Sequence, residues 1–276
     1  MSAIKLIALD MDNTLLLPDK TLSNQNQKVL TALQKKGIKI VLTTGRPFPN
    51  VKPFIEPLNL INDDFVILFN GSLILDLAAQ EPLFNQPFYL DELSSVLNLI
   101  HNLNLPVDLI SQDHVYAIKE YGQSAYIDFV GNLIDYSLTG LDQIPMGTTF
   151  NKFLVCADES QLDYLEDVLA KTPILTKNLN MMRSRRTLLE FMPKGVDKGN
   201  ALKYLLHHLG LKPANLMAFG DEENDRSMLQ LAHVSVAMDN AIPSIKAITT
   251  DVTSSNADDG VAQFLTKYFK LESFQS

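Results

Sequence analysis

The sequence predicts an α/β protein whose doubly wound, parallel-sheet core is interrupted by an inserted α+β domain. Near both ends of the chain, short apolar runs alternate with amphipathic segments, as in parallel sheets covered by helices on both faces. Between these ends the alternation is lost and helices and strands follow no regular order. We therefore expect a core built from residues 1–82 and 191–276, with an insert at 83–190.

The first part of the core opens with a buried strand. Residues 4–9 form a short, mostly apolar run, which is typical of a central parallel strand. Ser23 is expected to cap the following helix, and residues 38–42 form the next strand, so the three elements make a right-handed crossover. A third strand is predicted at 65–69.

The rhythm changes in the insert and then resumes. In the insert we expect helices at 91–103 and 160–169 and strands at 115–119 and 152–156. In the second part of the core we expect helices at 198–209 and 223–231 and strands at 216–219 and 234–237. The core is thus predicted to close around the insert.

Composition and charge exclude several classes of function. The 276 residues are 46% hydrophobic, enough for a large core, and 32 acidic against 23 basic residues give a net charge of −9. This balance argues against nucleic-acid binding but not against small phosphorylated ligands, which a local cation cluster can hold. Cys156 has no possible disulfide partner, and no apolar stretch approaches the ~20 residues of a membrane span. The start also lacks the features of a signal peptide, so we expect a cytoplasmic protein that binds no membrane.

Polar residues gather where open α/β sheets bind their ligands, at the carboxyl ends of strands and the starts of helices. The groups are Asp10 with Asp12 and Thr14, Thr44 with Gly45 and Arg46, Lys198, and Gly220-Asp221 with Asn224 and Asp225. Any one of them alone is more often a helix cap or a solvated loop residue. Together, and in this order, they indicate a site.

The carboxylates of this set predict a magnesium site. Asp10 and Asp12 directly follow a strand, and two like charges held close together raise each other's pKa unless a cation lies between them. Asp221, from a distant strand end, can join them in an all-oxygen site of the kind Mg²⁺ prefers. The five histidines show no metal-ligand spacing, so zinc is not expected.

These segments resemble the haloacid dehalogenase (HAD) superfamily and, within it, the Cof-type sugar phosphatases. The resemblance rests on DMDNT at 10–14, TTGR at 43–46, GVDKG at 195–199 and GDEEND at 220–225, with NGS at 70–72, VAMDNAIPSIK at 236–246 and DDGVA at 258–262. It extends over nearly the whole core. It implies a Rossmann-like, HAD-type core and an α+β cap of the C2 type.

The resemblance also implies a role for each matching residue. Asp10 is the nucleophile that forms an aspartyl-phosphate, and Asp12 is the acid/base, whose backbone carbonyl also contributes to the metal site. Thr44 hydrogen-bonds the phosphoryl group, and Lys198 neutralises charge on the nucleophile and phosphate. Asp221 holds Mg²⁺ together with Asp10. These roles suit the residue types.

Further residues are expected to bind phosphate or to support the site. Gly45 lets backbone N–H groups approach the phosphate, and Arg46, Asn70 and Asn224 are candidates for substrate contacts. Asp225 is expected to orient Asp221 or Lys198. Alternatives stay open: Asn224 and Asp225 could simply cap the following helix, and Arg46 could form an internal ion pair.

Two residues depart from the family pattern. Asn13 stands where many relatives carry glycine, and because asparagine tolerates a positive φ the turn is expected to survive. Thr43 stands where a small apolar residue or serine is common, and the sequence offers no interpretation of its hydroxyl.

The insert is expected to act as the lid. Only about 30 residues separate the Asp12 loop from Thr44, too few for a second domain, so the resemblance assigns leaving-group recognition to residues 83–190. Two groups in it have a functional and a structural interpretation. The first group is Arg183, Arg185 and Arg186, which could bind a second anionic group of the substrate or could lie on a solvated strand face. The second is Tyr116, Tyr121 and Tyr126, which could stack on a sugar ring or could pack in the core.

The sequence thus predicts a Mg²⁺-dependent phosphatase that hydrolyses phosphomonoesters of small metabolites, first of all sugar phosphates. The alternatives are a phosphomutase of the same superfamily and a non-catalytic, phosphate-binding regulatory module. The partner is a small phosphorylated metabolite. The oligomeric state and the physiological substrate stay open.

Overall fold

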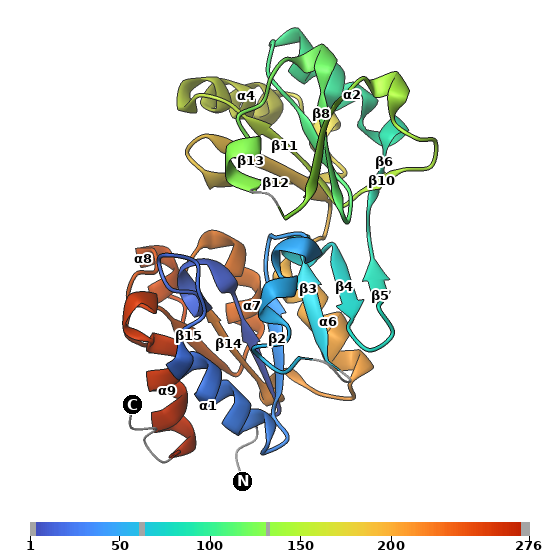
Figure 1. Cartoon of the computed structure of the whole chain (residues 1–276). Coiled ribbons are helices and arrows are strands. Elements are labelled where there is room, and N and C mark those ends of the chain that lie inside the picture. Colours follow the sequence, from blue (N-terminus) through green and yellow to red (C-terminus); the bar gives the residue numbers. More distant parts are fainter. Residues whose placement is uncertain (1–3, 61–63, 131–132, 272–276) are drawn as a thin grey trace. The chain divides into compact units, whose positions relative to one another are not determined.

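The computed structural model describes residues 4–60, 64–130 and 133–271 (Figure 1). The chain divides into two compact units. The core unit comprises Met1–Arg46, Val51–Phe84 and Asp197–Ser276, and the insert unit comprises Pro47–Asn50 and Asn85–Val196. Each unit is described by itself below.

An eight-stranded sheet forms the centre of the core unit. Its strands, in spatial order, are β16 (Asp251–Val252), β15 (Val234–Ala237), β14 (Leu216–Gly220), β1 (Leu6–Leu9), β2 (Lys39–Thr43), β3 (Phe65–Leu68), β4 (Leu73–Asp76) and β5 (Glu81–Asn85). All neighbouring pairs from β16 to β3 are parallel, whereas β3 and β4 are antiparallel. The turn Phe69–Gly71 that joins β3 to β4 is too short for a crossover connection. The predicted parallel sheet is therefore confirmed, with an antiparallel edge that was not predicted.

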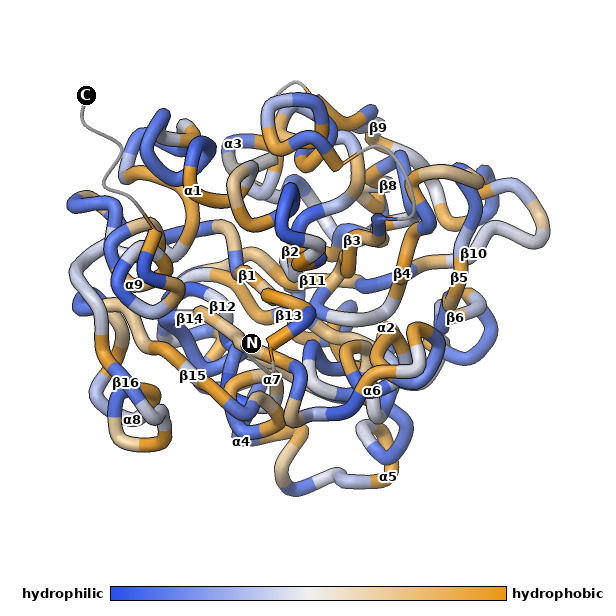
Figure 2. The backbone as a smooth tube through the Cα atoms, turned by 90° about the horizontal axis from the view of Figure 1, so that it is seen from below, coloured by the Kyte–Doolittle hydropathy of each residue, from blue (hydrophilic) through white to orange (hydrophobic). Residues whose placement is uncertain are grey.

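Helices cover both faces of this sheet. They are α1 (Asn24–Gln34), α6 (Lys198–His208), α7 (Arg226–Leu231), α8 (Pro243–Lys246) and α9 (Gly260–Phe269). Helix α1 contacts α9, and α6 contacts α7; Figures 1 and 2 place the two pairs on opposite sides of the sheet. Ser23 begins α1 as predicted, because its hydroxyl accepts the N–H of Asn26 at 3.0 Å. Many of the hydrophobic segments in Figure 2 lie in the sheet between the two helix pairs, and all four residues of β1 are buried.

The insert unit is α+β, as predicted. Its six-stranded sheet has the order β12 (Leu179–Arg185), β13 (Leu188–Pro193), β11 (Lys152–Cys156), β7 (Asp108–Ile110), β8 (His114–Ile118) and β9 (Asp135–Thr139), and a separate pair joins β6 (Phe88–Tyr89) to β10 (Thr149–Phe150). Its helices are α2 (Leu90–Asn102), α3 (Ile127–Val130), α4 (Glu159–Lys171) and α5 (Pro173–Thr176). Apolar side chains of α2 and α4 form one buried cluster with the sheet, in which the rings of Phe153 and Phe191 stack at 4.4 Å.

The predicted elements agree with the observed ones to within about two residues, with one exception. The helix expected at 223–231 begins as a 3₁₀ turn, Glu223–Asp225, before α7. After β1 the chain turns at Met11–Leu15, where the backbone angles of Asp12 and Asn13 are non-helical and Asn13 has a φ of +61°. None of the helices in the described ranges is long and apolar enough to cross a membrane.

Candidate active site

Three neighbouring parallel strands bring the predicted site residues together. Asp10 follows β1, Thr44 follows β2 and Asp221 follows β14, and β1 lies between the other two strands. Register keeps their ends level, since Leu9 at the end of β1 is opposite both Leu42 and Phe219. The carboxyl ends of strands that are distant in sequence therefore meet at one edge of the sheet, as expected for an open α/β fold.

Lys198 links the first and second parts of the core unit at this edge of the sheet. It is the first residue of α6 and is fully buried. Its ammonium donates to Asp10 Oδ1 at 2.5 Å and to Asp225 Oδ1 at 2.6 Å. Burial lowers the pKa of a lysine, but here the two carboxylates raise the pKa of Lys198 above its usual value, so the side chain stays charged.

The start of α6 is fixed by tight local packing. The Asp197 carboxylate caps the helix by accepting the N–H of Asn200 at 2.8 Å. The N–H of Gly199 donates to Ser227 Oγ at 2.9 Å, and a Cβ at Gly199 would lie 2.6 Å from the Ser227 carbonyl group. Only glycine permits this approach of α6 to α7. The packing places Lys198 between the two carboxylates.

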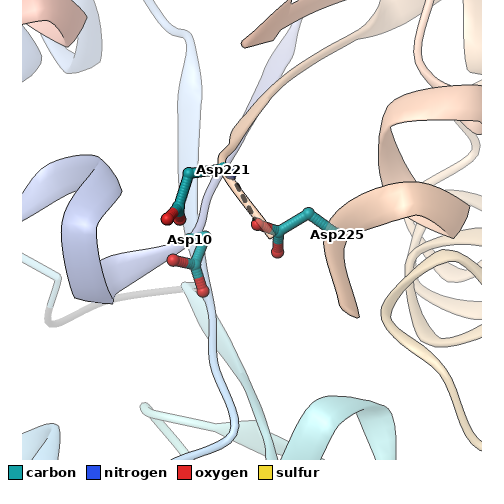
Figure 3. A group of neighbouring side chains, drawn as sticks. All are labelled: Asp10, Asp221 and Asp225. Carbon is teal, nitrogen blue, oxygen red and sulfur yellow. Dashed lines mark hydrogen bonds between the residues drawn. The ribbon is translucent and has the colours of Figure 1, made fainter. Parts of the chain in front are cut away.

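Asp225 holds the loop after β14. Its Oδ2 accepts the backbone N–H of Asp221 at 2.8 Å (dashed in Figure 3) and that of Glu222 at 3.2 Å, while its Oδ1 accepts Lys198. A Cβ at Gly220 would meet the Asp225 side chain at 2.5 Å. Asp225 therefore contacts both Lys198 and the backbone of Asp221, and the glycine before Asp221 makes room for its side chain.

The three carboxylates shown in Figure 3 are close enough to share one cation. Asp10, Asp221 and Asp225 are buried, and one oxygen of each lies within 4.8 Å of the others. Burial raises the pKa of Asp10 well above its usual value, and the charges of Asp225 and Asp221 raise it further. Burial and the Asp225 charge also raise the pKa of Asp221 to about 7. The carboxylates thus repel one another in the absence of a metal.

This donor set fits a hard divalent cation. Three carboxylates against one ammonium leave two negative charges when all are ionised, which a divalent ion would balance, and all the donors are oxygens. Because both oxygens of Asp225 already accept hydrogen bonds, Asp10 and Asp221 are the better direct ligands. Thr14 supports Asp221 by donating its hydroxyl to Oδ1 at 2.9 Å.

Asp12 lies apart from this cluster and is held by two cations. Arg46 binds it as a fork, Nε to Oδ2 at 2.8 Å and Nη2 to Oδ1 at 2.7 Å, and Lys20 Nζ lies 3.0 Å from the same Oδ1. Burial alone would raise the pKa of Asp12, but Arg46 and Lys20 together lower it to about 2. The internal ion pair that the sequence left open for Arg46 is therefore present.

Asn70 connects three other predicted residues, Thr44, Gly45 and Asn224. Asn70 donates its backbone N–H to the Thr44 carbonyl at 2.9 Å, and its side-chain oxygen accepts from Asn224 Nδ2 at 3.2 Å. A Cβ at Gly45 would lie 3.1 Å from the Asn70 amide, so glycine permits this close approach. Residues predicted separately from β2, β3 and the loop after β14 are thus brought together.

The hydroxyl of Thr43 has a structural role. It donates to the sulfur of Met228 at 3.2 Å, and both residues are buried. This contact ties the end of β2 to α7. The sequence offered no interpretation of Thr43, because its partner is 185 residues away.

The candidate groups in the insert unit have local partners. Arg183 bonds Glu166 at 2.5 Å and Asp163 at 3.0 Å, both on α4. Tyr121 and Tyr126 are buried. Burial favours core packing for the two tyrosines, whereas the Arg183 side chain is only 20% exposed and ion-paired, so it does not lie on a solvated strand face.

Comparison with known proteins identifies the family. The family model described as haloacid dehalogenase-like hydrolase matches residues 7–265. The chain belongs to this family. The predicted superfamily and fold class are thereby confirmed, and so is the assignment as an enzyme of the hydrolase class.

Similar proteins cover almost the whole chain. The HMP-PP phosphatase of Escherichia coli is 30% identical over 88% of this chain and 87% of its own. The 5-amino-6-(5-phospho-D-ribitylamino)uracil phosphatase YcsE of Bacillus subtilis is 28% identical over 94% of each chain. A crystal structure of a haloacid dehalogenase-like hydrolase from Bacteroides thetaiotaomicron superposes with a TM-score of 0.84 at 29% identity, covering 96% of this chain and 100% of that one.

One residue of the site was missed in the sequence. Lys20 lies eight positions after Asp12, in a polar loop with no recognisable pattern, yet its ammonium contacts the Asp12 carboxylate. Its positive φ of +68° is a property of the folded turn. Sequence spacing gives no signal for such a contact.

Proposed function

We propose that this protein is a Mg²⁺-dependent phosphatase that hydrolyses phosphomonoesters of small metabolites through an aspartyl-phosphate on Asp10. The observation that carries the proposal is the buried Lys198 ammonium, bonded to both Asp10 and Asp225 beside Asp221. It keeps a carboxylate nucleophile in place next to a concentration of negative charge that suits a divalent metal.

The first displacement transfers the phosphoryl group to Asp10. A carboxylate oxygen of Asp10 forms a bond to phosphorus as the bond between phosphorus and the ester oxygen breaks. Asp12, in its protonated form, delivers a proton to the departing oxygen. Lys198 and the hydroxyl of Thr44 stabilise the charge that develops on the phosphoryl oxygens.

The second displacement frees the enzyme. Asp12, now a carboxylate, takes a proton from water as the water oxygen bonds to phosphorus and the bond to Asp10 breaks. The products are inorganic phosphate and the original Asp10 carboxylate. The two hydrogen bonds from Arg46 to Asp12 favour the carboxylate form, which is the form that the second step requires.

Asp10, Asp221 and the backbone carbonyl of Asp12 are the groups proposed to hold Mg²⁺, which when bound would offset the negative charge of the phosphoryl group as the Asp10 carboxylate approaches it. The hydrogen bonds that the backbone N–H groups of Asp221 and Glu222 donate to Asp225 would keep this part of the site rigid.

Sugar phosphates are the first substrates to test. The similarity to enzymes named for HMP-PP and for a phosphoribityl compound supports small phosphorylated metabolites as the substrate class. Because these two relatives are named for different compounds at similar identity, family membership does not select one substrate.

The decisive variant is Asp10→Asn. We expect it to lower turnover of sugar phosphates and of an aryl phosphate by about 10³-fold or more, because the amide is not a nucleophile. Asp135→Asn, on an exposed strand residue, is the matched control. Undiminished activity of Asp10→Asn would contradict the proposal.

Two further measurements separate the alternatives. Chelation should abolish activity and added Mg²⁺ restore it. Inorganic phosphate should appear in a one-to-one ratio with substrate consumed, whereas a phosphomutase would release little and a regulatory module none.

A further inference from the structure

We propose that Asn240 is a positioning residue for the proposed Mg²⁺ site: by holding the Asn13 carbonyl it sets the direction of the neighbouring Asp12 carbonyl. The inference rests on the proposed function, in which the Asp12 carbonyl holds Mg²⁺ together with two carboxylates. Asn240 belongs to the segment VAMDNAIPSIK at 236–246, which takes no part in the proposed catalytic steps.

The turn between β15 and α8, residues 238–242, contacts both loops that carry the proposed ligands. Asn240 Nδ2 donates to the Asn13 carbonyl at 2.8 Å, in the loop after β1. The N–H of Ile242 donates to the Asp221 carbonyl at 3.0 Å, in the loop after β14. Two residues of one short turn thus link the backbones of two loops that are distant in the sequence.

The Asn240 amide has a defined orientation. Its Oδ1 accepts the N–H of Asn256 at 3.0 Å, so its Nδ2 is the atom that donates to Asn13. If the oxygen and nitrogen were exchanged, a donor would face the Asn256 N–H and an acceptor would face the Asn13 carbonyl. Asn256 is itself fixed, because it is buried and its Nδ2 donates to the Leu16 carbonyl at 2.7 Å. Asn240 is therefore held in the orientation that supports Asn13.

The hydrogen bond from Asn240 acts on the Asp12 carbonyl through a single residue. Because peptide units are planar, only the φ and ψ of Asn13 separate the Asp12 carbonyl from the Asn13 carbonyl. Asn13 has a φ of +61° and a ψ of 6°, in the left-handed region that few non-glycine residues occupy. Holding the Asn13 carbonyl in place therefore restrains the direction of the Asp12 carbonyl.

The link through Asn240 can be removed without altering any proposed ligand. Thr14 also joins the two loops, but it does so by donating its hydroxyl to Asp221 Oδ1 at 2.9 Å, on a ligand side chain. Asn240 is exposed and bonds backbone groups of Asn13 and Asn256. Because asparagine and alanine are both neutral, Asn240→Ala also leaves the charge of the site unchanged.

The test measures Mg²⁺ binding directly. Isothermal titration calorimetry of the full chain with MgCl₂ should give a dissociation constant about 10-fold higher for Asn240→Ala than for wild type, at the lower end of the range for groups that orient metal ligands. Half-maximal turnover of p-nitrophenyl phosphate should need a correspondingly higher Mg²⁺ concentration. Asn24→Ala, at an exposed asparagine of α1, is the matched control and should bind Mg²⁺ as wild type does.

The same variants separate positioning from a general loss of stability. Circular dichroism and the Tm without metal establish that Asn240→Ala is folded. A contact that only stabilised the fold would lower this Tm and leave the dissociation constant of the folded chain unchanged. An unchanged dissociation constant in Asn240→Ala, or an equal rise in Asn24→Ala, would overturn the proposal, while Mg²⁺ binding and phosphate release by wild type would still support the proposed function. If the wild-type chain bound no Mg²⁺, the proposed function would fail together with the role of Asn240.

Discussion

Two buried lysines, one in each unit, differ in the balance of charge around them. Lys198 in the core unit is fully buried and bonds two carboxylates, with a third close by. Lys152 in the insert unit is 3% exposed and donates to Glu190 at 2.7 Å, which is 5% exposed. The charges of Lys152 and Glu190 cancel each other. The Lys198 cluster keeps an excess of negative charge when its three carboxylates are ionised, and a divalent cation would balance it.

The largest effect is expected from Lys198→Met. The substitution removes the ammonium but keeps much of the volume, and we expect turnover to fall by at least about 10³-fold, since charge stabilisation at the reacting group is lost. The measurement is kcat for a phosphomonoester in excess Mg²⁺. Lys203→Met, on the exposed side of the same helix, is the control. Activity within a few-fold of wild type would show that the carboxylate cluster does not depend on Lys198.

Lys152→Met should act on stability rather than on turnover. It breaks a buried ion pair by removing the ammonium that donates to Glu190 at 2.7 Å, which costs about 3–5 kcal/mol. Chemical denaturation, followed by a probe in the insert unit, measures the loss. Adding Glu190→Gln in the same chain should recover part of it. If instead turnover per folded molecule dropped as far as in Lys198→Met, the contrast between the two lysines would fail.

A third buried charge, Asp108 in β7, predicts a pH dependence of stability. Burial raises its pKa to about 6, although Ser124 and Tyr136 hydrogen-bond it. Between pH 4 and 6 the folded chain holds this proton more tightly than the unfolded chain does, so stability falls as the pH rises, by ~3 kcal/mol at most. The loss is complete above about pH 6 and absent below about pH 4.

Asp108→Asn tests this dependence. The amide oxygen can still accept the hydroxyl of Tyr136, which Asp108 Oδ1 accepts at 3.0 Å, and it does not ionise. The variant should therefore lose the decline between pH 4 and 6 and be more stable than wild type at pH 7. Asp135→Asn in the same sheet controls for the general loss of one acidic group. If the stability of Asp108→Asn still fell between pH 4 and 6 as in wild type, other titrating groups would cause the decline.

The smallest expected effect is stabilisation by metal. Mg²⁺ at 100 times its dissociation constant should stabilise the core unit by about 2.7 kcal/mol, seen as a rise in Tm. The rise should be lost in Asp221→Asn and kept in Lys152→Met, because only the first variant removes a proposed ligand. Equal rises in Tm for both variants would show that Mg²⁺ binds at another site.

The sequence revealed the core better than the insert, for physical reasons. Strands buried on both faces leave continuous apolar runs, so β1, β2 and β14 were predicted closely, and the acidic residues directly after β1 and β14 drew attention to Asp10 and Asp221. Contacts set by the tertiary fold left no such trace. The bond from Thr43 to Met228 and the approach of Lys20 to Asp12 depend on turns and packing that spacing does not encode. The role of Arg183 could not be decided from the sequence, because its acidic partners are on helix α4 and only the fold brings them to strand β12.

The position of β1 also constrains how the chain is made. Its neighbours in the sheet are β2, which follows closely, and β14, which begins at Leu216. During synthesis from the N-terminus, one edge of β1 lacks its final partner until the whole insert has left the ribosome, and such edges are prone to wrong pairing. The same delay keeps Asp10 away from Lys198, 188 residues later. The contact between Asp10 and Lys198 therefore forms only after the insert has been synthesised.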